Sequence, residues 1–233
     1  MNNRLAIVPA RGGSKRLPGK NMMELGGKPL IFHTLDVVSP YFDCVIFTTD
    51  DSAMLKSVED SYENSNIAVR RRPDELCTDT SKVIDTVMHY VNTDEFAMHN
   101  QIWLCLPTCP LREGRDVENA QALLDSDIDS VLTVTDYEFP PSLGLLEGAE
   151  GLITGYDYRH PFASGNSRSQ DQPRVLRPNG ALYGSWKESL ISLGNFYKGK
   201  VRGSYMSRER SVDIDTKFDF MLAETLLKQG DGV

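Results

Sequence analysis

The chain has 233 residues, of which 40% are hydrophobic and 25% charged, and its formal net charge is −8. This composition is that of one ordinary globular domain, and without an apolar run near the roughly 18 residues of a membrane span it excludes a membrane protein. The acidic balance excludes nucleic acid as the main partner, and the apolar stretch near the N-terminus is too short for a signal peptide, so we expect a cytoplasmic protein with reduced cysteines.

Short apolar runs alternate with amphipathic stretches along the chain. In chain order they predict strands at 5–8, 44–47, 67–69, 102–106 and 130–134, separated by helices at 30–38, 52 to about 60, 81–91 and 117–124. Later segments predict strands at 181–186 and 212–214 and a helix at 218–227. This alternation predicts an α/β fold with a mostly parallel, doubly wound (Rossmann-like) sheet, and we expect residues 1–233 to form a single domain.

Residues 139–178 interrupt this pattern. They contain five prolines, which exclude a regular helix, but also many apolar side chains, among them Leu145, Leu146, Leu152 and Ile153. A loop of about 40 residues is rare in a compact domain, and burying even half of these side chains would contribute several kcal/mol. The segment is therefore an active-site lid or a dimerisation arm, and we predict an inserted arm that a second copy of the chain covers in a two-fold homodimer.

The segment 9–21 reads Pro-Ala-Arg-Gly-Gly-Ser-Lys-Arg-Leu-Pro-Gly-Lys-Asn and directly follows the first predicted strand. Open α/β sheets bind their ligands at this carboxyl edge. The glycines expose backbone N–H groups, and Arg11, Lys15, Arg16 and Lys20 add positive charge, so the segment offers both kinds of donor that phosphate oxygens accept. Its spacing matches neither a Walker A loop nor a dinucleotide-binding fingerprint.

The same segment is similar to the nucleotide-binding signature of the CMP-sialic acid synthetases, also called acylneuraminate cytidylyltransferases. Further segments resemble motifs of that family in the same order: 72–76 with Asp79-Thr80-Ser81, Leu106-Pro-Thr-Cys-Pro-Leu-Arg112, 177–181 and 211–216. The resemblance spans nearly the whole chain. It implies a bacterial CMP-nonulosonate synthetase, a nucleotidyltransferase that joins CTP to a sialic, legionaminic or related acid for lipopolysaccharide or capsule synthesis, with pyrophosphate as the second product.

The resemblance also implies which residues contact the substrates. CTP would be held by Arg11, Gly12, Gly13, Ser14, Lys15, Lys20, Asn21, Arg72 and Ser81. Arg72 and Ser81 resemble positions at the cytosine end, although Ser81 also suits a helix N-cap. The sugar acid would be held by Arg168, Gln170, Arg177 and Asn179. Because the resembled family dimerises through its arm and completes the sugar site across the interface, Arg168 acts either in its own chain or in the neighbouring one.

Asp213 and Asp215 stand two residues apart in a β-like segment, so both carboxylates face one side while Ile214 faces the core. Adjacent carboxylates repel each other unless a cation or proton compensates, and Mg²⁺ is typically held by one or two carboxylates plus substrate phosphates. The resemblance assigns both residues to Mg²⁺, with Mn²⁺ as an alternative ion. The residues alone leave open that one of them caps the following helix.

The mechanism then requires attack of the anomeric hydroxyl of the sugar on the α-phosphorus of CTP. Arg11 and Lys20 are the candidates to offset the charge that develops on the phosphates. The proton of the hydroxyl is accepted either by Asp215 or by a water on the metal. The catalytic set is therefore Arg11, Lys20 and Asp215.

Two departures from the family pattern concern the sugar. Leu106 stands where the family has Gln, and residues 139–143 lack a Lys that meets the sugar carboxylate in some bacterial members; Arg168, Arg174 or Arg177 could replace that charge. We therefore expect a legionaminic-type acid rather than N-acetylneuraminate.

The sequence leaves two alternative functions open. The first is a CMP-Kdo synthetase, whose loop has Pro where Asn21 stands, and the second is a non-catalytic nucleotide-binding module, which the intact Asp213, Asp215 and Lys20 disfavour. Among single residues, we expect His33 to be structural, and Asp50 to cap a helix rather than to support the site, although Asp51 or Ser52 could also cap the helix that runs to about residue 60.

Overall fold

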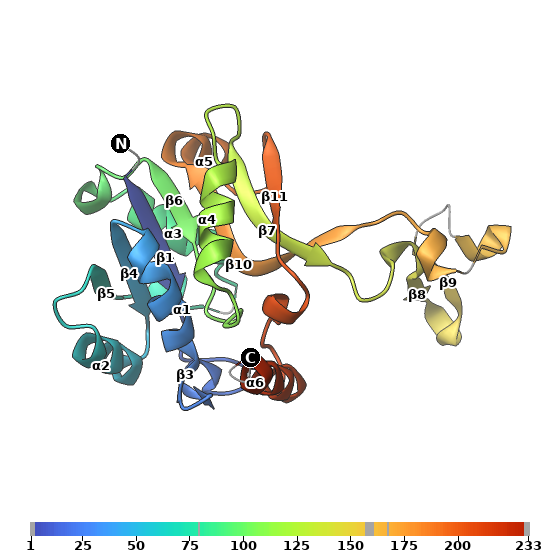
Figure 1. Ribbon diagram of the computed structural model, residues 1–233, viewed down its shortest axis with the longest axis horizontal. Helices are drawn as coiled ribbons and strands as arrows, with labels where there is room; N and C mark the ends of the chain where they lie inside the picture. Colours follow the sequence, from blue (N-terminus) through green and yellow to red (C-terminus); the bar gives the residue numbers. More distant parts are fainter. Residues whose placement is uncertain (1–2, 79, 157–160, 167, 231–233) are drawn as a thin grey trace.

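A seven-stranded sheet forms the body of the computed structural model, which describes residues 3–78, 80–156, 161–166 and 168–230 (Figure 1). The strand order is β11-β7-β10-β6-β1-β4-β5, and within this sheet β10 alone runs antiparallel to its neighbours. The strands are β1 (Arg4–Pro9), β4 (Cys44–Thr49), β5 (Ile67–Arg71), β6 (Gln101–Leu104), β7 (Ser130–Asp136), β10 (Leu176–Trp186) and β11 (Val201–Tyr205). The predicted mostly parallel α/β fold is confirmed.

Helices cover both faces of this sheet. They are α1 (Leu30–Val38), α2 (Ser52–Ser61), α3 (Val83–Val91), α4 (Gly114–Leu123), α5 (Lys187–Leu193) and α6 (Lys217–Gly230). Because side chains alternate along a strand, Ala6 and Val8 pack against α1, α2 and α4, whereas Leu5 and Ile7 pack against α3 and α5. Because helices cover both faces, the central strands of the sheet are apolar on both sides.

A third, smaller core joins the two ends of the chain. The short hairpin of β2 (Glu24–Leu25) and β3 (Lys28–Pro29) packs through Leu25 against α6, and Ile214 lies in the same cluster. This packing brings the segment after residue 211 alongside the loop that follows β1. The described part of the chain has no helix long and apolar enough to cross a membrane.

The segment between β7 and β10 projects from the body as an arm (Figure 1). It contains a small hairpin of β8 (Leu145–Glu147) and β9 (Ile153–Gly155), joined to short 3-10 turns. At its base, Arg174 forms a two-pronged ion pair with Asp136 at 2.6 and 3.0 Å, and the Tyr205 hydroxyl donates to the same carboxylate at 2.7 Å. Arg174, one of the candidates to meet the sugar carboxylate, thus braces the arm instead.

The predicted elements differ from the structure in three respects. Residues 212–214 are extended but form no strand, because the described backbone bond there is the single one from Ile214 N–H to the Thr108 carbonyl at 2.7 Å. β10 begins at Leu176, inside the predicted arm, and pairs with the end of β7. Helix α5 and strand β11 were not predicted at all.

Candidate active site

A cleft of about 490 Å³ lies beyond the carboxyl ends of β1, β5 and β6, the edge at which ligands bind in this architecture. Its wall combines the loop after β1, the start of α3, the turn after β6 and one residue of the C-terminal segment. The predicted site residues that line it are Arg11, Ser14, Lys15, Lys20, Asn21, Arg72, Ser81 and Asp215. Residues far apart in the sequence therefore meet as expected.

The loop after β1 is held in place from two sides. Asn21 Nδ2 donates to the Arg11 carbonyl at 3.0 Å, and the Gly12 N–H donates to Asp50 Oδ1 at 2.9 Å. Gly12 and Gly13 are not among the described residues of the cleft wall, so their contact with CTP stays a prediction. The expectation that Asp50 caps a helix is wrong, because Asp51 accepts the first free N–H groups of α2.

Lys20 connects the two ends of the chain at the floor of the cleft. Its ammonium lies 2.9 Å from Asp215 Oδ1 and 2.7 Å from the Ile214 carbonyl, and only 11% of its side chain is exposed. Arg16 contacts the other oxygen of Asp215 at 2.8 Å. The Arg16–Asp215 contact was not foreseen, because no local pattern in the sequence links residues 199 positions apart.

The two aspartates face different cavities. Asp215 lines the cleft, whereas Asp213 lines a second cavity of about 410 Å³ together with Arg177 and Arg208. Burial raises the pKa of Asp213, and the nearby Asp215 adds to that rise, while a hydrogen bond from Thr108 opposes it. Ile214 between them is fully buried, as the alternation predicts, but the two carboxylates line different cavities and not a common one as expected.

Neither aspartate caps α6, so that alternative is wrong. Thr216 accepts from the Asp219 N–H at 3.3 Å, and Asp219 in turn accepts from the Thr216 N–H at 2.7 Å, which is a capping box. In the described part of the chain, no three His, Cys, Asp or Glu side chains converge on one point. Asp215 on the cleft wall, with Asp213 near enough to interact with it electrostatically, nevertheless fits the one or two carboxylates by which proteins typically hold Mg²⁺.

The cleft wall also carries buried polar groups that are not fully bonded. Arg72 is 4% exposed and donates from Nη2 to the Thr48 carbonyl at 3.1 Å, but its Nε has no hydrogen-bond partner within the described structure. The same holds for Asn21 Oδ1. Burial lowers the pKa of Arg72. Unpaired buried polar atoms are costly, so both atoms suit a polar ligand.

Ser81 is not a helix N-cap, because α3 begins at Val83 with Lys82 in the cap position. Its hydroxyl donates to the Glu75 carbonyl at 3.1 Å and contacts Thr78 Oγ1 at 2.6 Å. The turn that carries this residue also receives Arg11, whose guanidinium donates to the Thr78 carbonyl at 3.3 Å. Asp79 of the resembled motif lies outside the described residues.

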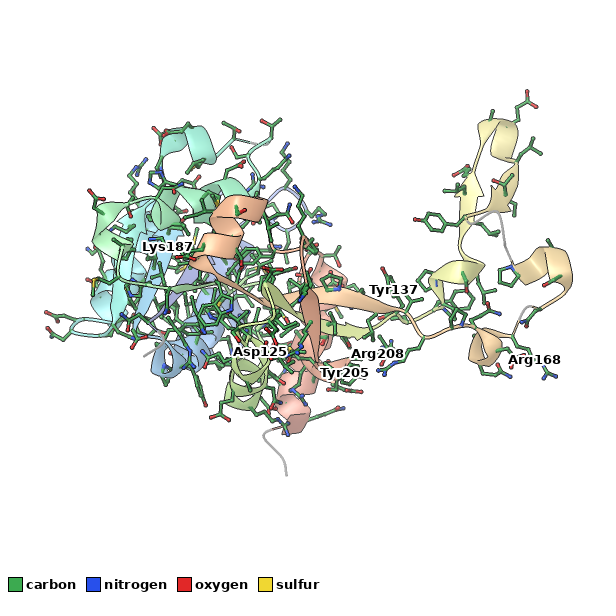
Figure 2. The ribbon with its side chains drawn as sticks, turned by 90° about the horizontal axis from the view of Figure 1, so that it is seen from above. Asp125, Tyr137, Arg168, Lys187, Tyr205 and Arg208 are labelled. Carbon is green, nitrogen blue, oxygen red and sulfur yellow. The ribbon has the colours of Figure 1, made fainter. Side chains whose placement is uncertain are left out.

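The predicted sugar residues are divided between two places. Arg177, on β10, lines the second cavity near Asp213. Asn179 is 1% exposed; its amide donates to Ser211 Oγ at 2.8 Å and accepts from the Ala181 N–H at 3.1 Å. Arg168 and Gln170 lie on the arm, and Figure 2 shows Arg168 far from the body. One chain therefore does not bring all four together.

A third cavity, of about 190 Å³, adjoins the cleft and was not predicted. Leu106 and Val83 line both spaces, and Tyr183 and Phe196 add aromatic surface to the smaller one. Leu106 stands where the resembled family has Gln, so the sequence gave one sign of an apolar wall here. No pattern in the sequence indicated that Tyr183 and Phe196 would contribute to this cavity.

The last residue of the motif after β6 has a structural role. Arg112 is 2% exposed and donates to the Ala181 carbonyl at 2.6 Å, to Thr34 Oγ1 at 3.1 Å and to the Cys109 carbonyl at 2.9 Å. It therefore fixes the turn that carries Leu106 and Thr108 to β10 and α1.

The family model for cytidylyltransferases matches residues 5–126, more than half of the chain. The chain belongs to the cytidylyltransferase family. It is 31% identical over 230 residues to the CMP-N,N'-diacetyllegionaminic acid synthase of Legionella pneumophila, with 96% of each protein covered. Over 221 residues it is 34% identical to the N-acylneuraminate cytidylyltransferase of Streptococcus agalactiae serotype V, which covers 93% of this chain and 51% of that protein.

These relatives confirm the resemblance to the CMP-nonulosonate branch of the family. The chain spans about half the length of the streptococcal relatives that it matches. Among solved structures, CMP:2-keto-3-deoxy-manno-octonic acid synthetase complexed with CTP aligns with a TM-score of 0.67 at 18% identity, covering 98% of this chain and 100% of that one. This likeness confirms the cytidylyltransferase fold.

Proposed function

We propose that this chain transfers the cytidylyl group of CTP to a nonulosonic acid, giving a CMP-sugar and pyrophosphate. The observation that carries the proposal is the lining of the cleft: Arg11, Lys15, Arg16 and Lys20 supply positive charge, and the buried Arg72 has an Nε without a hydrogen-bond partner in the described structure. A nucleoside triphosphate combines negatively charged phosphates with a hydrogen-bonding base, and so matches both features. The names of the relatives support cytidine and a sugar acid as the two substrates.

In the proposed reaction, the anomeric hydroxyl oxygen forms a bond to the α-phosphorus while the bond from that phosphorus to the pyrophosphate oxygen breaks. Negative charge develops on the phosphoryl oxygens and on the leaving group. Lys20 and Arg11 are the cations held at the cleft that can offset this charge, which is the main source of catalysis in such transfers. The hydroxyl proton passes to a base, and Asp215 is the carboxylate of the cleft wall that can accept it.

We further propose that Asp213 and Asp215 hold Mg²⁺, for which Mn²⁺ is an alternative. The ion supplies charge neutralisation at the phosphates when it is bound. The chain's own contribution is to keep the two carboxylates fixed on either side of the buried Ile214, with Thr108 orienting Asp213 and Lys20 orienting Asp215.

The sugar acid is proposed to approach from the cavity on the Asp213 side. Arg177 and Arg208 line this cavity and would complement a sugar carboxylate. The small cavity beside Leu106 has an apolar wall suited to an acyl or methyl group, which favours a legionaminic-type acid over one with only hydroxyl groups there.

The arm is proposed to complete the site in a two-fold homodimer. Its described apolar side chains are widely exposed, including Leu152 at 69% and Ile153 at 63%. Because Arg168 lies at the far end of the arm (Figure 2), a second copy is the means by which it and Gln170 would reach a cleft. Separately, we propose that the reaction takes place in the cytoplasm, as expected from the sequence.

A pyrophosphate-release assay with CTP, Mg²⁺ and a panel of acids tests the proposed function. We expect release that requires both CTP and a nonulosonic acid, with a legionaminic-type acid preferred over N-acetylneuraminate. Release with Kdo alone would instead assign a CMP-Kdo synthetase. Tight CTP binding without release from any acid would assign a non-catalytic nucleotide-binding module.

A further inference from the structure

Asp50 occupies a central place at the edge of the sheet. It directly follows β4, and β4 lies between β1 and β5 in the strand order. The loop with Gly12 follows β1, and Arg72 follows β5. The topology therefore sets one carboxylate between the two parts of the cleft, of which the first is expected to hold phosphates and the second the base.

The contact of Asp50 with the first part is direct. The parallel ladder between β1 and β4 ends with the bond from the Ala10 N–H to the Thr48 carbonyl at 3.0 Å. The bond from the Gly12 N–H to Asp50 Oδ1, at 2.9 Å, continues that connection one step beyond the ladder through a side chain. A hydrogen bond to an ionised carboxylate is about twice as strong as one between neutral groups.

This bond also decides which way the loop faces. The Gly12 N–H points to Asp50, while the neighbouring Arg11, Ser14 and Lys15 line the cleft. A Cβ atom on Gly12 would come within 3.1 Å of Asp51 Cβ, so the close approach of the loop to the β4 end also favours glycine.

The influence of Asp50 on the second part is electrostatic. The groups that favour the charged form of the buried Arg72 are Cys77, Asp50 and Tyr90, in that order. Burial raises the pKa of both Cys77 and Tyr90, so these two groups are neutral at pH 7. Asp50 is the carboxylate among these three and favours the charged form of Arg72, which the nearby Arg11 disfavours.

We propose that Asp50 is a positioning residue that fixes the phosphate-binding loop and the buried Arg72 in one arrangement before nucleotide binds. The inference rests on the proposed function, because it takes the cleft to be the CTP site. Asp50 is not among the described residues of the cleft wall, so it acts through Gly12 and Arg72 and not by touching CTP.

The test compares three variants of the full chain: Asp50→Ala, Asp50→Asn and Asp51→Asn. Asparagine at 50 keeps an oxygen that can accept the Gly12 N–H but removes the charge. Asp51→Asn is the matched control, because it removes the same charge at the same strand end and keeps a good N-cap for α2. CTP affinity is measured by calorimetry, and amide hydrogen exchange is followed in residues 9–21 without nucleotide.

We expect Asp50→Ala to weaken CTP binding by about 10- to 100-fold, the range for loss of a hydrogen bond to a charged group. Asp50→Asn should weaken it by about 3- to 10-fold, and Asp51→Asn by less than about 2-fold. In turnover, the KM for CTP should rise more than kcat falls. Exchange of the loop amides should become at least about 10-fold faster in Asp50→Ala.

CTP affinity in Asp50→Asn equal to that of Asp51→Asn would overturn the inference, even if Asp50→Ala failed to fold. Loss of folding stability in the Asp50 variants, with unchanged CTP affinity of the folded protein, would likewise reduce Asp50 to a structural residue. If the unaltered chain bound no CTP, the proposed function would fall, while the exchange data would still report whether Asp50 holds the loop.

Discussion

The cleft and the arm differ in how many of their side chains find contacts within one chain. At the cleft, several charged side chains are bonded across the sheet edge within the chain, such as Lys20 to Asp215 and Asp50 to Gly12, and the buried Arg72 Nε and Asn21 Oδ1 are left for a ligand. On the arm, Leu145, Leu152 and Ile153 lie largely exposed, and the described contacts to the body are gathered at its base. The cleft is thus built within one chain, whereas the arm presents a surface that one chain does not cover.

This difference assigns the two regions separate tasks. Substitutions in the cleft should lower turnover without changing assembly, because the cleft residues are held by contacts within the chain. Substitutions on the arm should change assembly first and leave CTP binding intact. The predictions below test this division, beginning with the largest expected effect.

Asp213→Asn and Asp215→Asn should each lower kcat by at least about 100-fold, the size of effect expected for an electrostatic contact made in the transition state. Steady-state rates over a range of Mg²⁺ concentrations measure this. Glu224→Gln, an exposed change on α6, serves as the control and should leave the rate unchanged. Near-normal turnover with ordinary Mg²⁺ dependence in both aspartate variants would refute the metal assignment.

Arg72→Lys should lower kcat/KM for CTP by about 10- to 100-fold and reduce the preference for CTP over UTP, because a buried donor set is lost. The unaltered protein should strongly prefer CTP to UTP, ATP and GTP. The neighbouring Arg71 is exposed and pairs with Asp74, so Arg71→Lys should change these values by less than about 2-fold. Equal kcat/KM values for CTP and UTP in the unaltered protein would contradict a base-reading role for Arg72.

Ile153→Lys should disrupt assembly, because a charge would replace an exposed apolar side chain of the arm. Sedimentation should show the unaltered protein near twice 26.1 kDa and the variant near 26.1 kDa. Turnover should fall to the level of Arg168→Ala, because no cleft then receives Arg168 from a partner, while CTP affinity should change less than about 2-fold. Met98 is 78% exposed on the body, so Met98→Lys should leave both unchanged; a fully active monomeric chain would overturn the arm assignment.

The smallest effect concerns the body beneath the cleft. Burial lowers the pKa of His33, whose Nε2 lies 2.8 Å from the Leu25 carbonyl. Because the folded state then binds its proton less readily than the unfolded chain, stability should fall as the pH drops below about 6.5, by at most about 1.4 kcal/mol per pH unit. Urea unfolding over a range of pH should show a shallower dependence of stability on pH in His33→Gln than in the unaltered protein; identical slopes in the two proteins would contradict this.

Sequence patterns predicted the sheet and the cleft well, because both depend on local signals. The apolar strand before Pro9 and the glycines and cations after it predict a phosphate-binding loop without knowledge of the rest of the chain. The alternation of Asp213, Ile214 and Asp215 correctly predicts which side chain is buried.

Other features depend on contacts that no local pattern reveals. Asp50 resembled a helix cap because it stands before a helix, but the adjacent Asp51 takes that position and leaves Asp50 to the loop. Arg174 on the arm resembled a sugar contact, yet Asp136 and Tyr205 bind it. Helix α5 has only seven residues, too few for a clear helical period, and β11 has exposed residues at most positions.

The division of tasks between cleft and arm is tested most directly by mixing two variant chains, Arg168→Ala and Asp215→Asn, after each has been shown to be inactive alone. If Arg168 serves the neighbouring cleft, a mixed dimer places both changes in one site and leaves the other site intact, so pyrophosphate release should partly return. If no activity returns at any mixing ratio, although both variants dimerise and bind CTP, the site is contained in one chain and the account is contradicted.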